Sequence, residues 1–167
     1  MTQSAVSFPP IAAPCPRALI LGSMPGVKSL QENQYYAHPR NSFWQIMGAL
    51  FNAPVSSYAQ RRALIKGNAL ALWDVLKSCT RRGSLDSNIR NAEANDFAAF
   101  LKKHAGITRI SFNGATAEKE FKKRVWPHLP EGVAARLELK RLPSTSPAHA
   151  SMNMARKQKE WMIVKGK

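Results

Sequence analysis

The chain has 167 residues, of which 44% are hydrophobic and 21% are charged, so it is long enough for one compact domain and too apolar for a disordered chain. Its 25 lysines and arginines outnumber the 10 aspartates and glutamates and give a net charge of +15, which favours a polyanionic partner such as nucleic acid over a merely basic or a membrane-surface protein. The two cysteines lack metal-ligand spacing and are too few for a four-cysteine iron–sulfur cluster, and no apolar run is long enough to span a bilayer.

Residues 1–16 are expected to form an extended lead-in, because four prolines there exclude a helix and the basic start of a signal peptide is missing. Residues 17–167 are expected to form a single domain, since neither a repeat nor a linker interrupts them. Short apolar runs predict strands, and apolar residues at helical spacing predict helices. The strands are expected at 18–21, 69–73, 109–112 and 136–139, and the helices at 42–51, 57–66, about 96–104, 115–125 and about 149–164.

Strands and helices alternate along this domain, which is typical of an α/β layer fold with a mainly parallel sheet. The alternating polarity of residues 136–139 indicates an edge strand, and residues 81–86 are expected to form a polar loop. In such folds, sites form at the carboxyl ends of the strands. Three distinctive loops, at 22–26, 113–114 and 144–148, are therefore expected to converge on one site.

The first of these loops, Gly22-Ser23-Met24-Pro25-Gly26, could hold a phosphate or a base, because glycine lets the backbone approach a ligand closely. It lacks the Gly-Lys-Ser/Thr of a Walker loop and the glycine spacing of a dinucleotide-binding fingerprint. A tight turn without a site is an equally open interpretation of this segment alone.

The segment 35–44 places four aromatic residues beside His38, Arg40 and Asn41. Aromatic rings stack on bases and arginine contacts phosphate, so this composition is typical of nucleotide recognition. The alternative is that the rings belong to the core of the following helix, which we favour for Trp44 and leave open for Phe43.

Metal chemistry is not indicated, because the four histidines lack metal-site spacing and the paired cysteines of zinc deaminases are absent. We therefore expect no metal and no other cofactor. Asp74 and Asp86 could form a carboxylate pair, or each could cap a loop.

Taken together, these motifs resemble the uracil-DNA glycosylase superfamily. The family pattern is Gly-x-x-Pro-Gly after the first strand, followed by Ala-His-Pro-x-Asn-x-Phe-Trp, and the chain carries both, at 22–26 and 37–44. It is similar to the mismatch-specific uracil-DNA glycosylases and closer to the hypoxanthine-DNA (deoxyinosine) glycosylases, which share Gln-Tyr-Tyr at 34–36 and Leu-Pro-Ser-Thr-Ser-Pro-Ala at 142–148. The resemblance runs from about Ala18 to the last helix.

The resemblance implies a three-layer α/β/α sandwich around a central four-stranded, mainly parallel sheet. It implies a monofunctional glycosylase that hydrolyses the N-glycosidic bond of a flipped deaminated base in DNA and leaves an abasic site. Hypoxanthine is the expected base. The alternatives are uracil or a broad specificity that includes xanthine, or a noncatalytic module that binds modified bases. We expect a monomer that binds DNA and no membrane, in the cytoplasm or, in a bacterium, at the nucleoid.

Site residues follow from motif positions in the family. Asn41 is expected to orient the attacking water. Met24 and Leu142 stand where relatives have polar catalytic residues, which favours hypoxanthine over uracil as the substrate. The base is expected to contact Gly22, Ser23, Met24, Tyr36, Phe43 and Asn113, and the rest of the DNA to contact Pro25, Gly26, His38, Arg40, Ser144, Thr145, Ser146 and Pro147.

Overall fold

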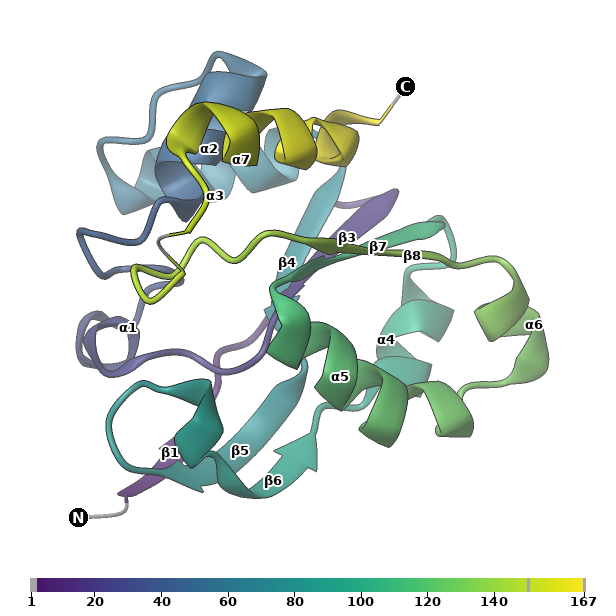
Figure 1. The fold of residues 1–167 in the computed structure, drawn as a ribbon. Helices are drawn as coiled ribbons and strands as arrows, with labels where there is room; N and C mark the ends of the chain where they lie inside the picture. Colours follow the sequence, from purple (N-terminus) through teal and green to yellow (C-terminus); the bar gives the residue numbers. More distant parts are fainter. Residues whose placement is uncertain (1–2, 150, 167) are drawn as a thin grey trace.

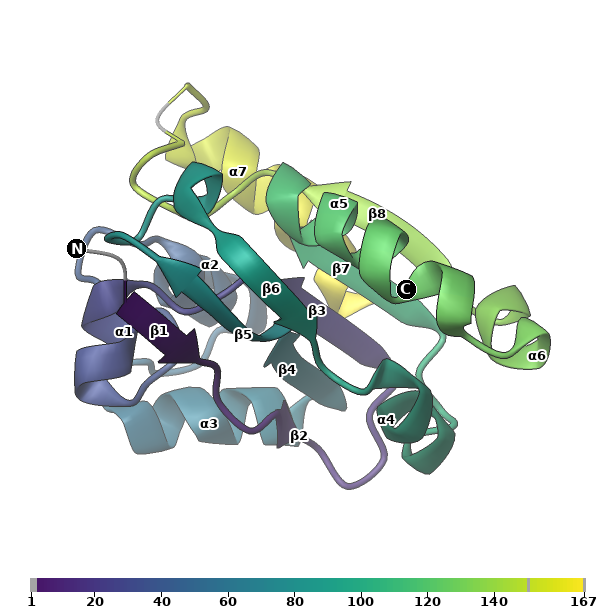
Figure 2. The same ribbon diagram turned by 90° about the horizontal axis from the view of Figure 1, so that it is seen from below.

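A computed structural model of the chain describes residues 3–149 and 151–166, which form a central sheet with helices on both faces (Figures 1 and 2). The sheet has the strand order β2 (Ile11–Ala12), β4 (Leu70–Asp74), β3 (Ala18–Gly22), β7 (Arg109–Asn113) and β8 (Glu138–Leu142). β3 pairs in parallel with β4 and β7, and β7 pairs in parallel with β8. The four expected strands are therefore present, although the last one, an edge strand as predicted, covers 138–142 instead of the expected 136–139.

The sheet has five strands rather than the expected four. The additional strand, β2, comes from the lead-in and pairs antiparallel with β4, with Ile11 opposite Leu72 and Ala12 opposite Ala71. A strand of two residues is too short to show a hydrophobic period, so the sequence did not indicate it.

A second, antiparallel sheet was not predicted. It consists of β1 (Gln3–Val6), β5 (Leu76–Arg81) and β6 (Arg90–Ala94), in the order β1-β5-β6. β5 continues from β4 after one residue and ends at the buried Arg81, where the sequence suggested that a polar loop begins. Strand β6 has no buried residue, so it carries little hydrophobic pattern that could reveal it.

The helices lie in two groups, one on each face of the central sheet (Figure 1). On one face, Ile20 packs in a cluster with Phe43, Ile65 and Trp161, and on the other face Leu21 packs with Phe121. This arrangement confirms the three-layer α/β/α sandwich. The helices are α1 (Val27–Glu32), α2 (Phe43–Phe51), α3 (Tyr58–Gly67), α4 (Phe97–Lys103), α5 (Ala115–Arg124), α6 (Glu131–Ala135) and α7 (Met154–Trp161), with short 3-10 turns η1 (Asp86–Asn88), η2 (Trp126–His128) and η3 (Met162–Lys165).

The final helix is shorter than the expected span of 149–164. The helix α7 begins at Met154, and the residue before it, Asn153, is its cap. The side chain of Asn153 accepts a hydrogen bond from the backbone N–H of Arg156. Residues 143–149, which follow the last strand, form a loop, and most of it lines the site described below. Within the described ranges, no helix is long and apolar enough to cross a bilayer.

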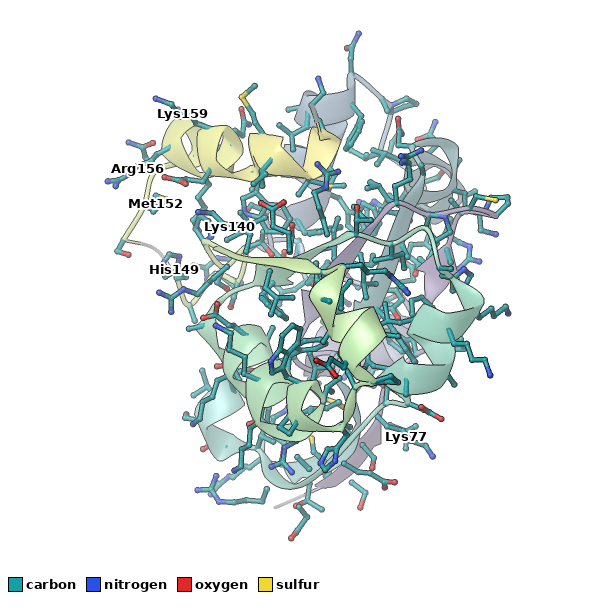
Figure 3. All side chains as sticks on the ribbon, turned by 90° about the vertical axis from the view of Figure 1, so that its right-hand side faces the viewer. Lys77, Lys140, His149, Met152, Arg156 and Lys159 are labelled. Carbon is teal, nitrogen blue, oxygen red and sulfur yellow. The ribbon has the colours of Figure 1, made fainter. Side chains whose placement is uncertain are left out.

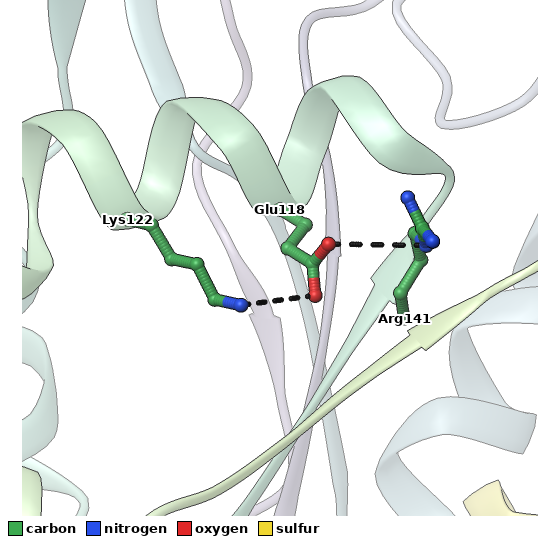
Figure 4. Close-up of polar contacts among 3 residues, drawn as sticks. All are labelled: Glu118, Lys122 and Arg141. Atoms are coloured by element: carbon green, nitrogen blue, oxygen red, sulfur yellow. Dashed lines mark hydrogen bonds and ion pairs between the residues drawn. The ribbon is translucent and has the colours of Figure 1, made fainter.

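Helix α5 is tied to the edge strand β8 by charged side chains. Glu118 pairs with Lys122 at 3.3 Å and with Arg141 of β8 at 3.8 Å (Figure 4). Lys122 and Arg141 are exposed, so each pair contributes at most about 1 kcal/mol. The contacts therefore orient α5 along the sheet more than they stabilise the fold.

Candidate active site

A cleft of about 380 Å³ opens at the carboxyl ends of β3, β4, β7 and β8. The three loops that were expected to converge all line it, together with the η1 turn. Its lining comprises residues 22–29, 84–87 and 144–149 with Tyr36, His38, Asn41, Asp74 and Asn113. Arg40 and Phe43, which the sequence analysis placed among the site residues, are not part of this lining.

The loop at 22–26 is held from behind by the backbone. The carbonyl oxygens of Gly22 and Ser23 accept hydrogen bonds from the N–H groups of Val75 and Leu76, at 2.8 and 3.1 Å. Behind the same loop, the buried Arg81 guanidinium donates to the carbonyl oxygen of Pro25. The loop is therefore preorganised as one wall of the cleft.

Gly22 is required where it stands, because two polar side chains approach its backbone. A Cβ atom at this position would lie 2.6 Å from Asp74 Oδ1 and 2.7 Å from the Tyr36 hydroxyl. Real Cβ atoms essentially never approach other atoms this closely. The glycine of the motif thus creates the space in which Asp74 and Tyr36 meet at the base of the cleft.

Asn41 lies in the loop that leads into α2. Its side-chain Oδ1 accepts a hydrogen bond from the backbone N–H of Phe43 at 2.9 Å. The backbone N–H of Asn41 donates to the carbonyl oxygen of His38, also at 2.9 Å. The first bond fixes the plane of the amide and engages one of the two lone pairs of Oδ1. The other lone pair of Oδ1 accepts no hydrogen bond from the described residues.

The aromatic residue that faces the cleft is Tyr36, not Phe43. Phe43 is fully buried, and its ring stacks on that of Tyr36 with centroids 4.2 Å apart and planes 25° apart. A base in the cleft would therefore meet Tyr36, and Phe43 would support that ring from behind. Trp44 is a core residue, as we favoured, and its indole N–H donates to the carbonyl oxygen of Tyr35. Sequence alone could not show which of these consecutive rings covers the next.

Asn113 and Thr145 form a closed pair on the opposite wall. The Asn113 amide nitrogen donates to Thr145 Oγ1, and the Thr145 backbone N–H donates to Asn113 Oδ1, both at 2.9 Å. Thr145 is only 1% exposed. The Thr145 hydroxyl therefore holds the Asn113 amide in place, and the second N–H of Asn113 is not used in this pair.

The loop after Thr145 is stabilised by its own serines. Ser144 Oγ accepts from the N–H of Ser146, and Ser146 Oγ accepts from the N–H of Ala148, both at 3.2 Å. His38, Pro25, Gly26 and Pro147 line the cleft, and His38 is exposed. Arg40 is also exposed but lies outside this lining.

Asp74 is the residue that the sequence analysis undervalued. It is 3% exposed at the end of β4, lines the cleft, and its Oδ2 is buried with no hydrogen-bond partner among the described residues. Burial, and to a lesser degree the Asp86 carboxylate, raise the pKa of Asp74 to about 7, although the Arg81 guanidinium opposes the shift. Its place directly after an apolar strand was the signal that could have identified it.

Asp86 stands at the rim of the same cleft. It is exposed and accepts a hydrogen bond from Ser23 Oγ at 2.9 Å, which joins the η1 turn to the loop at 22–26. Asp74 and Asp86, which were noted as a possible carboxylate pair, therefore line one cleft, but Asp74 is buried and Asp86 is exposed. No group of three or more His, Cys, Asp or Glu side chains in the described part of the chain could hold a metal ion.

Comparisons with known proteins agree with this geometry. The family described as the uracil DNA glycosylase superfamily matches residues 9–165. A hypoxanthine DNA glycosylase of Methanosarcina acetivorans is 34% identical over 94% of this chain and 95% of its own length. Its namesake in Methanosarcina barkeri is 37% identical over 64% of this chain and 69% of its own length. A solution NMR structure of a Methanosarcina acetivorans protein assigned as a uracil DNA glycosylase superposes with a TM-score of 0.79, at 30% identity, over 98% of this chain and 97% of its own.

Proposed function

Because the chain belongs to the uracil-DNA glycosylase superfamily, we propose that it hydrolyses the N-glycosidic bond of hypoxanthine in DNA and leaves an abasic site. The observation that carries this proposal is the cleft itself, which brings the family loop at 22–26 and Asn41 together around a space for one base. Both curated relatives described above are named hypoxanthine DNA glycosylases, which supports hypoxanthine as the base.

Docking on DNA would use the positive charge of the chain. Figure 3 shows Lys140, Arg156 and Lys159 on the same side of the molecule as His149, which lines the cleft. The three basic side chains are exposed, and the net charge of +15 favours a polyanion through counterion release. We propose that the chain binds as a monomer, with the rim of the cleft against the phosphates.

The base would enter the cleft after extrusion from the helix. This step costs a few kcal/mol and less at a mispaired base. The cleft volume of about 380 Å³ lies within the range of small-molecule sites. In the cleft the base would lie against Tyr36, which Phe43 holds by stacking.

Cleavage develops positive charge on the sugar and negative charge on the departing base. The free lone pair of Asn41 Oδ1 would orient a water molecule toward the sugar carbon, and a water attacking an already cationic centre needs orientation more than deprotonation. Donors aimed at the base, such as the remaining N–H of Asn113, would stabilise the negative charge.

Strand cleavage through a Schiff base is not part of the proposal. Lys28 is the lysine that lines the cleft, and its ammonium group pairs with Glu32 at 3.0 Å while its side chain remains 44% exposed. A nucleophilic lysine is instead activated by burial or by a neighbouring cation. We therefore propose a monofunctional enzyme.

Hypoxanthine is preferred over uracil in this proposal because of two apolar residues. Met24 is 7% exposed and packs into the core on one face of the sheet, and Leu142 is 1% exposed in the core on the other face. Neither can hydrogen-bond to a water molecule as the polar residues of uracil-specific relatives would.

The test uses labelled duplexes that carry inosine, uracil or xanthine, incubated with the protein and then treated with alkali. Breaks at inosine that exceed those at the other two bases are expected. Comparable breaks at uracil or xanthine would point to broad specificity. A mobility shift with no alkali-labile site on any duplex would reject the enzyme and favour a noncatalytic module that binds modified bases.

A further inference from the structure

The carboxyl group of Asp74 is placed for chemistry rather than for stability. It is 3% exposed, lines the cleft, and has an oxygen atom, Oδ2, that no described residue hydrogen-bonds. Its other oxygen lies against Gly22, beside the Tyr36 hydroxyl, which is likewise buried without a partner within the described ranges. Leaving a buried polar group unpaired costs about 1–3 kcal/mol, and Asp74 Oδ2 is therefore an atom that a base in the cleft could satisfy.

Burial is the main reason why the pKa of Asp74 is raised, and the charged groups around it act in opposite directions. Asp86 in the η1 turn adds negative charge, the hydroxyl groups of Tyr35 and Tyr36 offer no charge, and Arg81 of β5 is the nearby cation. The Arg81 guanidinium donates to the carbonyl oxygen of Pro25 and makes no ion pair with Asp74. Near neutral pH a large fraction of Asp74 is therefore a carboxylic acid with an O–H to donate.

The two candidate bases differ in what they need from such an acid. Hypoxanthine leaves through N9, and a proton accepted at N7 makes it a neutral leaving group. Uracil leaves through N1 as an anion, and its pyrimidine ring has no counterpart of N7 to accept that proton. A protonated carboxyl group in the cleft thus suits a purine.

We propose that Asp74 is the general acid that protonates N7 of the departing hypoxanthine, an inference that rests on the proposed function. The C1′–N9 bond breaks and its electron pair moves into the purine, while the proton of the Asp74 carboxyl group passes to N7. Water adds to C1′ and releases a proton to solvent, and Asp74 takes up a proton from solvent before the next turnover.

The first experiment compares Asp74→Asn with the wild-type protein in single-turnover excision of hypoxanthine across a pH series. Asp74→Asn is expected to slow excision about 100-fold. The wild-type rate is expected to fall as pH rises above about 7, and the variant is expected to lack this fall. Asp96→Asn is the matched control, since Asp96 caps α4 outside the cleft and asparagine caps a helix equally well.

The second experiment replaces the target nucleotide with 7-deaza-2′-deoxyinosine, which has no N7 to protonate. Asp74→Asn is expected to cut this analogue as slowly as the wild-type protein does. An equal slowing of both substrates by the substitution would show a structural role for Asp74 and overturn the inference. If the variant does not fold, as judged by thermal melting, the wild-type protein still decides: a hypoxanthine rate that is independent of pH above 7 contradicts the acid.

The two proposals fail in different ways. A wild-type protein that makes no alkali-labile site at inosine would reject the proposed function and this inference with it. A wild-type protein that excises hypoxanthine, with Asp74→Asn equally fast, would reject the role of Asp74 alone.

Discussion

The two walls of the cleft differ in how their polar side chains are paired. On the β3/β4 wall, formed by Gly22, Tyr36 and Asp74, the Tyr36 hydroxyl and Asp74 Oδ2 are buried and no described residue makes a hydrogen bond to them. On the β7/β8 wall, Asn113 and Thr145 satisfy each other through two hydrogen bonds of 2.9 Å. The contrast suggests a division of labour. We infer that the β7/β8 wall is held in shape by its own hydrogen bonds and presents the remaining N–H of Asn113, whereas Asp74 Oδ2 on the β3/β4 wall has no hydrogen-bond partner among the described residues.

Substitution of Asn41, which lines the cleft from the loop before α2, is expected to have the largest effect on excision. Asn41→Ala removes the carbonyl that would orient water, and excision is expected to fall about 1000-fold while duplex binding is kept. Single-turnover rates and mobility shifts measure the two effects. Gln45→Ala, an exposed change on the adjoining α2, serves as the control. Excision by Asn41→Ala at the wild-type rate would move the chemistry entirely to the β3/β4 wall.

Asp74 allows a test through stability instead of activity. Its pKa is raised from 3.8 to about 7 in the folded chain, so the folded state holds a proton that the unfolded state releases. The free energy of unfolding therefore falls as pH rises from about 4 to 7, by roughly 4 kcal/mol. Asp74→Asn is expected to remove this loss and to be more stable than wild type at pH 8. Urea melts at pH 4 and pH 8 that show the same difference between the two proteins would contradict the buried, unpaired carboxyl.

Gly22 tests whether the close approach on the β3/β4 wall matters. In Gly22→Ala the new Cβ must displace Asp74 or Tyr36, and a displacement of about 1 Å in a site costs about 100-fold in rate. Gly67→Ala is the matched control, because Gly67 ends α3 with no atom within 4 Å of the added carbon, and alanine favours a helix. Excision rates of the two variants should therefore differ by about that factor, and equal rates would argue that the wall yields without consequence.

Thr145 tests the scaffold wall and should give the smallest effect on rate. Thr145→Val keeps the shape of the side chain but removes the oxygen that Asn113 donates to, at a cost of about 2 kcal/mol of stability. Excision is expected to change less than tenfold, since the hydroxyl supports Asn113 rather than touching DNA. Thermal melting measures the loss of stability and excision assays measure the change in rate, and Thr108→Val, a substitution at an exposed position, is the control. A loss of activity without a loss of stability would place Thr145 on DNA after all.

Much of this arrangement could be predicted from local sequence. The apolar runs at β3, β4 and β7 and the Ser57 cap of α3 express short-range rules, and the parallel order then brings the loops at 22–26 and 144–148 together. The antiparallel sheet could not be predicted, because β1 and β5 are distant in sequence and their pairing leaves little hydrophobic signature.

The site was predictable to a similar depth. Motif positions led to Asn41 and to the loop at 22–26, which do line the cleft. Two features of the site depend on how the packed fold arranges its segments. One is that Tyr36 covers Phe43, and the other is that Asp74 Oδ2 has no hydrogen-bond partner among the described residues. Such packing is decided by the whole fold rather than by a motif.

The N-terminal segment has a consequence for how the protein is handled. β1 pairs with β5 and β2 pairs with β4, so two strands within residues 3–12 cover the open edges of two consecutive strands. A truncation before Ala13 would expose both edges, and exposed edges recruit strands from other chains. A form shortened in this way is therefore expected to aggregate, although all the residues that line the cleft are still present in it.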